Sequence, residues 1–313
     1  MRIGDLLQFR VLQNRAARRA QRRLSKRRRR RSHQLTNNDQ TRCLEALEQR
    51  ILLSTFDVTK TADTADGSCS LTDCSLREAI IAANVNGTGQ DTINVPAGIY
   101  TLTIANTSGD EDSAAEGDLD INSNLILDGV GAGSTIIQAG ASAAAGIDRV
   151  FHVDADVTAA ITVSLEDITV QHGNVGSSIG GGINVDFHND STLTLTRVTV
   201  DDNTTTGFGG GIGSAGGTTL NIIDSTISNN TAGTDGSGNT GGIHCAGCTL
   251  DMDNSTVSGN IAGNGAASSD AGGIQISGNG GPHTIDNSTI TNNTADDIGG
   301  GIQYTSLDSH RGR

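Results

Sequence analysis

A run of closely spaced acidic residues offers the first candidate chemistry in this chain of 313 residues. Calcium prefers carboxylate oxygens as ligands, and acidic residues in one loop can supply several of them. The spacing does not match an EF-hand loop, and a solvated acidic loop is the alternative interpretation. Calcium is the one cofactor that the sequence suggests, and its weak candidate ligands are Asp110, Asp112, Glu116, Asp118 and Asp120.

The cysteines form two close pairs and one outlier. Cys69 and Cys74 are near enough in sequence to close a small loop, and Cys245 and Cys248 form a Cys-x-x-Cys. A lone Cys-x-x-Cys is a weak metal or redox signal. In the alternation of inward and outward side chains along the predicted strands, both of its cysteines fall at inward positions. We therefore expect a local disulfide or two buried thiols. Without Cys43 an even set of four remains, which is compatible with an oxidising compartment.

Candidate catalytic groups are sparse. A polysaccharide lyase needs a basic side chain that removes a sugar proton, but no Lys follows Lys60, and only Arg149 and Arg197 remain as strong cations of the repeats. A glycosidase needs paired carboxylates on one face, whereas the pairs at 201–202 and 296–297 are adjacent in sequence, so their side chains tend to diverge. We expect no catalytic residue, with a polysaccharide lyase or glycoside hydrolase as the alternative. The histidines share no ligand spacing and are interpreted as exposed or turn residues: His152, His172, His188, His244 and His283.

Charge divides the chain into two parts. Residues 1–50 carry 15 basic and 4 acidic side chains, whereas residues 51–310 carry 4 basic and 31 acidic ones. The acidic body should repel nucleic acid and attract cations. No apolar run reaches the roughly 18 residues of a membrane helix, so we expect no membrane-spanning helix.

Residues 1–54 are predicted to be a disordered basic leader. A nucleic-acid arm is the alternative for the run Lys26–Arg31. The segment Leu47–Ser54 resembles the Leu-Glu-Pro-Arg-x-Leu-Leu-Ser leader motif of bacterial surface proteins, with Gln49 in place of Pro. The resemblance implies export to the exterior, the cell surface or the outer membrane of a bacterium.

Internal repeats predict the fold of the remaining chain. A Thr recurs at 169, 199, 226, 256 and 289, with spacings of 30, 27, 30 and 33 residues. Before each Thr, apolar and polar residues alternate, which indicates a strand with one buried face. The alternation then skips one residue, as expected where the chain turns a corner. The small inward residues at this corner in the later repeats are Ser225, Ser255 and Ser288.

Each repeat continues with an Asn and then a Gly-rich segment that ends in Ile. Asn tolerates the left-handed backbone of a turn, and stacked Asn side chains can form amide ladders. Gly permits a bend, after which Ile restarts the buried face. We therefore expect three short strands and three corners in each repeat. The predicted ladder residues are Asn203, Asn230, Asn260 and Asn293.

Stacking such repeats gives an all-β fold, a right-handed single-stranded parallel β-helix of the pectate-lyase type. The repeats resemble those of polymorphic outer-membrane proteins, which pair a Gly-Gly-Ala-Ile-like motif with Phe-x-x-Asn. Val or Ile replaces the Phe here, at residues 200, 227, 257 and 290. The resemblance implies an adhesin-like surface role.

A short helix is predicted to cap the N-terminal end of the β-helix. Ser75 and Glu78 form a capping-box pattern, and apolar residues at 76, 79, 80 and 83 share one face. The segment 74–79 reads Cys-Ser-Leu-Arg-Glu-Ala and resembles the CSLREA domain of bacterial β-helix surface proteins. The resemblance extends through 117–121 and 148–153 and covers about residues 56–183. It implies an exported module, often a piece of a larger protein.

The expected organisation is a leader (1–54), a cap with the first coils (55–160), repeat coils (161–304) and an irregular tail (305–313) that marks a truncation. The expected function is that of a non-catalytic secreted or cell-surface module. Its faces and loops would present binding surfaces to glycans or proteins, and the mature body would bind no nucleic acid. Fold alone does not carry function, so the ligand stays open.

Overall fold

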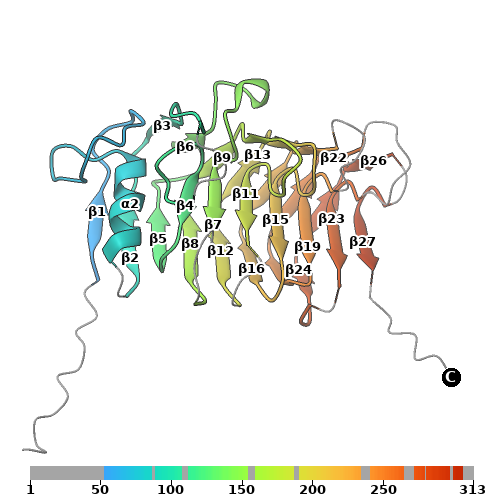
Figure 1. Cartoon of the computed structure of the whole chain (residues 1–313). Coiled ribbons are helices and arrows are strands. Elements are labelled where there is room, and N and C mark those ends of the chain that lie inside the picture. Colours follow the sequence, from blue (N-terminus) through green and yellow to red (C-terminus); the bar gives the residue numbers. More distant parts are fainter. Residues whose placement is uncertain are drawn as a thin grey trace, which may run out of the picture. The chain divides into compact units, whose positions relative to one another are not determined.

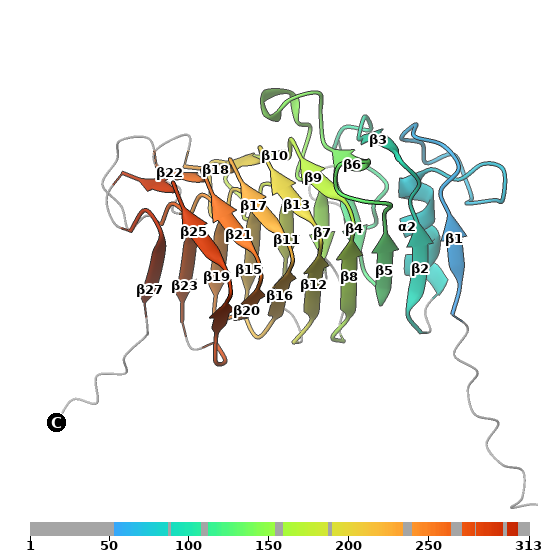
Figure 2. The ribbon, with the colours of Figure 1, turned by 180° about the vertical axis from the view of Figure 1, so that it is seen from behind.

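The chain is described by a computed structural model over residues 53–86, 89–107, 112–153, 159–186, 190–233, 240–263, 271–278, 280–296 and 299–305. Parallel strands stack coil upon coil in this part of the chain (Figures 1 and 2). This confirms the predicted all-β parallel β-helix. The predicted leader and tail lie outside the described residues, apart from Leu53, Ser54 and Thr305.

The strands form four parallel sheets, numbered in the order in which each coil meets them. Sheet 1 contains β1 (Thr55–Asp57), β2 (Asp91–Asn94), β5 (Leu125–Asp128), β8 (Thr162–Glu166), β12 (Thr192–Thr196), β16 (Thr219–Ile223), β20 (Thr249–Asp253) and β24 (Thr284–Asp286). Sheet 2 contains β3 (Gly98–Thr101), β6 (Thr135–Gln138), β9 (Thr169–Gln171), β13 (Thr199–Asp201), β17 (Thr226–Ser228), β21 (Thr256–Ser258) and β25 (Thr289–Thr291).

Sheet 3 consists of two-residue strands: β10 (Asn174–Val175), β14 (Thr204–Thr205), β18 (Thr231–Ala232), β22 (Ile261–Ala262) and β26 (Thr294–Ala295). Sheet 4 contains β4 (Leu119–Ile121), β7 (Phe151–Val153), β11 (Ile183–Val185), β15 (Ile212–Ala215), β19 (Ile243–Ala246), β23 (Ile274–Ser277) and β27 (Ile302–Thr305). Each repeat therefore has four strands, and the prediction of three is wrong. The sheet 3 strand was missed because two residues are too few to display an alternation of apolar and polar side chains.

The core is a column of like side chains stacked in register. Leu193 of β12 pairs with Leu220 of β16, which pairs with Leu250 of β20, and all three are fully buried. The alternate residues of these strands point outward, as the period of two predicted. Each coil fills its slice of the column with aliphatic side chains, so the fold needs few aromatic ones.

The corner between sheets 1 and 2 explains the skipped residue. From β8 to β24, the residue after each sheet 1 strand has a left-handed backbone, as at Arg197 (φ 56°) and Asp224 (φ 51°). The next inward residue is buried, and Ser225 accepts a hydrogen bond from the backbone N–H of Val198 at 3.0 Å. Ser255 accepts one from the N–H of Ser225 at 3.1 Å. A small inward residue at this corner is thus confirmed.

The corner between sheets 2 and 3 carries the predicted amide ladder. The side-chain Nδ2 of Asn203, Asn230 and Asn260 each donates to Oδ1 of the Asn in the next coil, over 2.9–3.0 Å. The prediction that these Asn residues have left-handed backbones is wrong. The preceding position has that backbone, for example Asp202 (φ 50°) and Asn229 (φ 54°). The left-handed residue precedes the Asn because the side chain of the ladder Asn must point inward. The ladder residues are Asn203, Asn230, Asn260 and Asn293.

The glycine-rich segments bring neighbouring coils into backbone contact. A Cβ added at Gly210 would lie 2.6 Å from the carbonyl oxygen of Gly241 and 2.6 Å from the backbone of Thr231. We expect Gly210→Ala to lower the free energy of unfolding by about 1–3 kcal/mol, the usual cost of overpacking. Gly133→Ala is the control, because a Cβ there meets no atom within 4 Å. Urea unfolding of both variants checks this, and equal losses would contradict it.

The predicted capping helix is α2 (Leu76–Asn86), and it covers the first coils (Figure 1). Its capping box is formed: the N–H of Ser75 donates to Glu78 Oε2 at 2.8 Å, and the N–H of Glu78 donates to Ser75 Oγ at 3.1 Å. The predicted apolar face is buried at Leu76, Ala79, Ile80 and Ala83. The helix therefore closes the apolar column against water.

Glu78 gives this cap a pH dependence. Burial opposes ionisation of Glu78, but hydrogen bonds from the backbone of Ser75 and Asp66 and from the Thr64 hydroxyl lower its pKa from 4.5 to about 2. The folded pKa lies below the unfolded value, so Glu78 stabilises the fold above about pH 4.5, and this contribution is lost as the pH falls towards 2. Urea titrations from pH 5 to pH 2 should show a steeper loss for the wild type than for Glu78→Gln. Parallel curves would contradict this.

Both predicted cysteine pairs are disulfides. Cys69 and Cys74 are joined immediately before α2, and Cys245 and Cys248 are joined where β19 gives way to β20. Cys245 and Cys248 are fully buried, as the strand parity predicted. The four cysteines of the body are thus paired without Cys43, which lies outside the described residues.

Candidate functional site

The structure separates the predicted calcium ligands. Asp110 lies outside the described residues. Glu116 accepts hydrogen bonds from the backbone N–H and the hydroxyl of Thr107, at 2.8 and 2.9 Å. Asp118 pairs with Arg149, with 3.2 Å between the carboxylate Oδ2 and Nε. Two candidates, Asp112 and Asp120, come together, and they meet a histidine.

The histidine is His152, and strand register places it. β4 and β7 pair in parallel, so that Asp120 lies beside His152 on the outer face of sheet 4, and Asn184 of β11 follows in the same row. All three are buried although they point away from the core. The segment before β4 covers the row, since the N–H of Ala114 donates to Asp120 Oδ2 at 2.7 Å.

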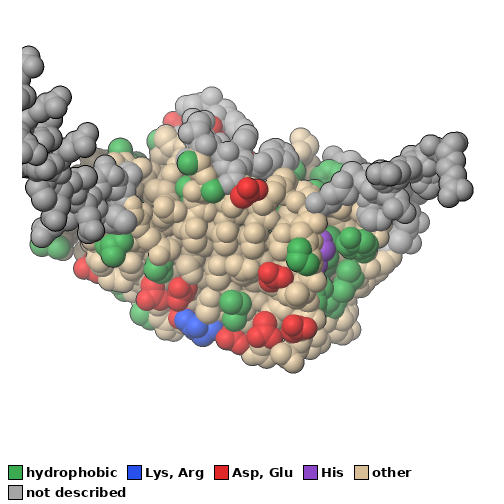
Figure 3. All heavy atoms as spheres, turned by 90° about the horizontal axis from the view of Figure 1, so that it is seen from below, with side chains coloured by type: hydrophobic (Ala, Val, Ile, Leu, Met, Phe, Trp, Pro, Cys, Tyr) green, Lys and Arg blue, Asp and Glu red, His purple; other side chains and the backbone are tan. Residues whose placement is uncertain are grey.

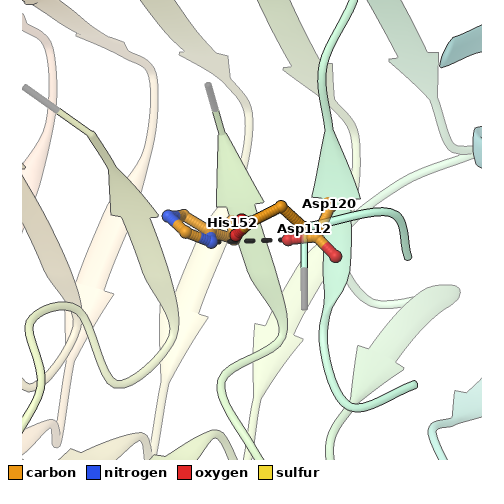
Figure 4. Close-up of side chains that lie close together, drawn as sticks. All are labelled: Asp112, Asp120 and His152. Atoms are coloured by element: carbon orange, nitrogen blue, oxygen red, sulfur yellow. Dashed lines mark ion pairs between the residues drawn. The ribbon is translucent and has the colours of Figure 1, made fainter. Parts of the chain in front are cut away.

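Figure 4 shows the resulting cluster of Asp112, Asp120 and His152. Ligand-capable atoms of these three side chains lie within 4.8 Å of one another. His152 Nδ1 is 3.4 Å from Asp120 Oδ1, and its Nε2 is 3.3 Å from Oδ1 of Asp186. Asp186 also accepts a hydrogen bond from the side chain of Asn184 at 2.9 Å. The imidazole is therefore held between carboxylates at both nitrogens.

Electrostatics at this cluster favour positive charge. Burial works against the protonated imidazole, but the carboxylates of Asp120 and Asp186 beside its two nitrogens raise the pKa of His152 to about 9. Burial also raises the pKa of Asp118, as does the neighbouring Asp120 carboxylate, while Arg149 opposes this shift. Carboxylates thus outnumber cationic side chains inside a poorly solvated site.

An open pocket lies beside Arg149, the partner of Asp118. It is lined by Asn106, Ile147, Asp148, Arg149, Asn174, Val175, Gly176 and Ser178. Arg149 donates to the hydroxyl of Ser178 at 3.0 Å, and its side chain is 7% exposed. His152 and Asp120 do not line the pocket, and their side chains are 7% and 0% exposed. A large substrate in this pocket would not reach the imidazole.

The prediction that the histidines are exposed or turn residues is correct for some positions and wrong for others. His172 occupies a turn with φ 61°, whereas His152 and His244 are buried on the outer face of sheet 4. His244 Nδ1 lies 2.8 Å from Oε1 of Gln275, and burial lowers its pKa. His188 lies outside the described residues. One sequence signal could have placed such residues on sheet 4. A single polar residue stands between two apolar ones in Leu119–Ile121 and in Phe151–Val153.

Sheet 2 presents a regular polar surface. On sheet 2 one row consists of a Thr from each of five successive strands, paired Cα to Cα: Thr169, Thr199, Thr226, Thr256 and Thr289. Figure 3 shows one side of the molecule, where acidic side chains stand among uncharged polar ones. The basic side chains of the described chain that reach solvent are those of Lys60 and Arg197, at 23% and 49% exposed.

Comparison of the chain with protein-family models, curated proteins and solved structures finds no match. The resemblances to the leader, the CSLREA domain and the outer-membrane repeats therefore stay predictions. Among the described residues, no helix has both the length and the apolar character that a membrane span requires.

Proposed function

We propose that this chain is a non-catalytic β-helix module of the bacterial exterior or cell surface that binds surface glycans or proteins along its side. The observation that carries the proposal is the in-register threonine row on the outer face of sheet 2. Strands in a parallel sheet lie about 4.8 Å apart. From Thr199 to Thr289 the row is therefore an evenly spaced line of hydroxyl groups, whereas Thr169 is buried and donates to the carbonyl oxygen of Ala132 at 2.6 Å.

A glycan chain suits such a line, because its hydroxyl groups can exchange hydrogen bonds with many equivalent side chains. A second polar row lies two residues further along the same strands, and Ser228 of this row donates to Asp201 Oδ1 at 2.6 Å. Its members are Gln171, Asp201, Ser228, Ser258 and Thr291. Each contact is weak, but several made by one ligand reinforce one another through effective concentration. Affinity should therefore rise with ligand length.

The burial of the Asp120–His152 cluster supports a non-catalytic role. A general acid or base must come within hydrogen-bond reach of the substrate, and these side chains are at most 7% exposed. A polysaccharide lyase or glycoside hydrolase remains the alternative function. Product formation from polysaccharides distinguishes the two.

A binding assay tests the proposal. The purified chain should bind soluble polysaccharides in calorimetry, and Thr226→Arg with Thr256→Arg should weaken binding at least tenfold by blocking the row. The control is Thr194→Arg with Asn221→Arg, which adds the same charge on sheet 1. Equal loss in both variants, or release of reducing ends or unsaturated sugars, would overturn the proposal.

The exported location is tested separately by cell fractionation and mapping of the mature N-terminus. The two disulfides support an oxidising compartment. A surface protein that starts near Ser54 is the expected result. An intact Met1 start in the cytoplasm would overturn the location and make the arginine-rich run the main functional feature.

A further inference from the structure

We propose that Asp112, Asp120 and His152 bind a transition-metal dication such as Zn²⁺. The three ligands come from separate places in the chain, namely the segment before β4, β4 itself and β7. Stacking of the first coils brings them together, so the site exists only in the folded β-helix. The proposal is independent of the function proposed for sheet 2.

The distance between the two strand residues suits a metal ion better than a hydrogen bond. An N–H···O hydrogen bond spans about 2.7–3.2 Å between heavy atoms, whereas His152 Nδ1 and Asp120 Oδ1 are 3.4 Å apart. Two ligand atoms that each lie about 2.0–2.1 Å from a tetrahedral ion are separated by roughly 3.4 Å. Asp112, whose ligand atom lies within 4.8 Å of both, needs a small inward shift to complete the set.

The surroundings of His152 are those of a metal ligand. A metal-bound histidine usually donates its other ring N–H to a carboxylate, which fixes the ring orientation. Nε2 of His152 faces Asp186 at 3.3 Å, and Asp186 is itself held by the side chain of Asn184. Asp120 is also oriented, because its Oδ2 accepts the N–H of Ala114 while Oδ1 faces the imidazole. These contacts fix the ligand atoms of His152 and Asp120 before an ion arrives.

The ligand types select the class of ion. Calcium and magnesium prefer sites built from oxygen atoms alone, whereas imidazole nitrogen suits zinc, copper, iron and nickel. Asp118, Asp120 and Asp186 place three carboxylates around Arg149 and the imidazole, so the cluster attracts further positive charge. A dication between Asp112, Asp120 and His152 would supply that charge.

Metal titration of the full oxidised chain tests the proposal. After chelation, Zn²⁺ and Co²⁺ are added and the bound equivalents are measured by calorimetry and elemental analysis. The wild type should bind one equivalent more than His152→Gln, and the Co²⁺ absorption bands of that site should vanish in the variant. His244→Gln is the matched control, because His244 is a buried histidine in the same outer row with an amide partner. It should bind as many equivalents as the wild type.

A second variant keeps the proposal testable if His152→Gln does not fold. Asp186→Asn retains the three ligands but removes the carboxylate behind His152, and it should weaken Zn²⁺ binding by roughly 10–100-fold. Equal Zn²⁺ uptake by wild type and His152→Gln would overturn the proposal. So would unchanged affinity in Asp186→Asn, or binding of Ca²⁺ in preference to Zn²⁺.

Discussion

Replacing Arg77 with Ala should lower the free energy of unfolding by about 3–5 kcal/mol, the cost expected when one member of a buried ion pair is removed. Its guanidinium is fully buried and pairs with Asp63, at 2.7 Å from Nε to Oδ1 and 3.3 Å from Nη2 to Oδ2. Asp63 would be left charged and buried, because its side chain is 3% exposed.

Arg77 also ties α2 to the chain that leads into β4. It donates to the carbonyl oxygens of Ala114, Gly117 and Asp118, at 2.9, 2.8 and 3.0 Å. Removal of the guanidinium leaves these acceptors buried without their charged donor, at a cost that adds to that of Asp63. Loss of Arg77 should therefore loosen the cap and the segment that covers Asp120.

Denaturant unfolding measures the loss, and hydrogen exchange of the α2 amides locates it. Arg197→Ala is the matched control, because Arg197 makes a similar ion pair with Asp167 at the surface, with its side chain 49% exposed. Such an exposed pair contributes at most about 1 kcal/mol. Losses of equal size in both variants would contradict a special role for Arg77.

Replacing Asn230 with Ala should cost about 2–4 kcal/mol, because it leaves several buried polar groups without partners. Asn230 Oδ1 accepts from both the backbone N–H and the side chain of Asn203, each at 3.0 Å. Its Nδ2 donates to the carbonyl of Val200 at 3.0 Å and to Asn260 Oδ1 at 2.9 Å. No water can replace these bonds without opening the corner, since Asn230 is fully buried.

The neighbouring residue supplies the control. Asn229 has a left-handed backbone (φ 54°) and makes one exposed hydrogen bond, to Asp201. Gly occupies the equivalent position 259, so Asn229→Gly should change stability by about 0.5 kcal/mol or less. Thermal and urea unfolding of the two variants check the comparison. A loss for Asn230→Ala no larger than for Asn229→Gly would show that the ladder contributes little.

The repeats made the solenoid and its ladder predictable. Asn203 and Asn230 have the same residue type at the same place in consecutive repeats, and stacking in register must bring them together. The capping box at Ser75 and Glu78 was predictable because it is local. Each of these inferences depends on residues whose relation is visible along the sequence.

The Asp120–His152 cluster was not predictable in this way. Its two strands lie in coils without the later repeat pattern, and the pairing depends on a register that the sequence does not display. The segment before β4 contacts Asp120, and the ring of Phe208 packs on His244, so both are buried although the strand alternation alone would leave them exposed. Arg77 was missed because its partners Asp63 and Gly117 are distant in sequence.

The asparagine ladder also gives the β-helix an electrical direction. From Asn203 to Asn293 every link of the ladder runs from Nδ2 of one Asn to Oδ1 of the Asn in the next C-terminal coil, so the amide dipoles align head to tail. Aligned hydrogen bonds polarise one another, and each strengthens as the chain of bonds grows. Each bond in the middle of the row should therefore be stronger than the same bond in an isolated pair of coils.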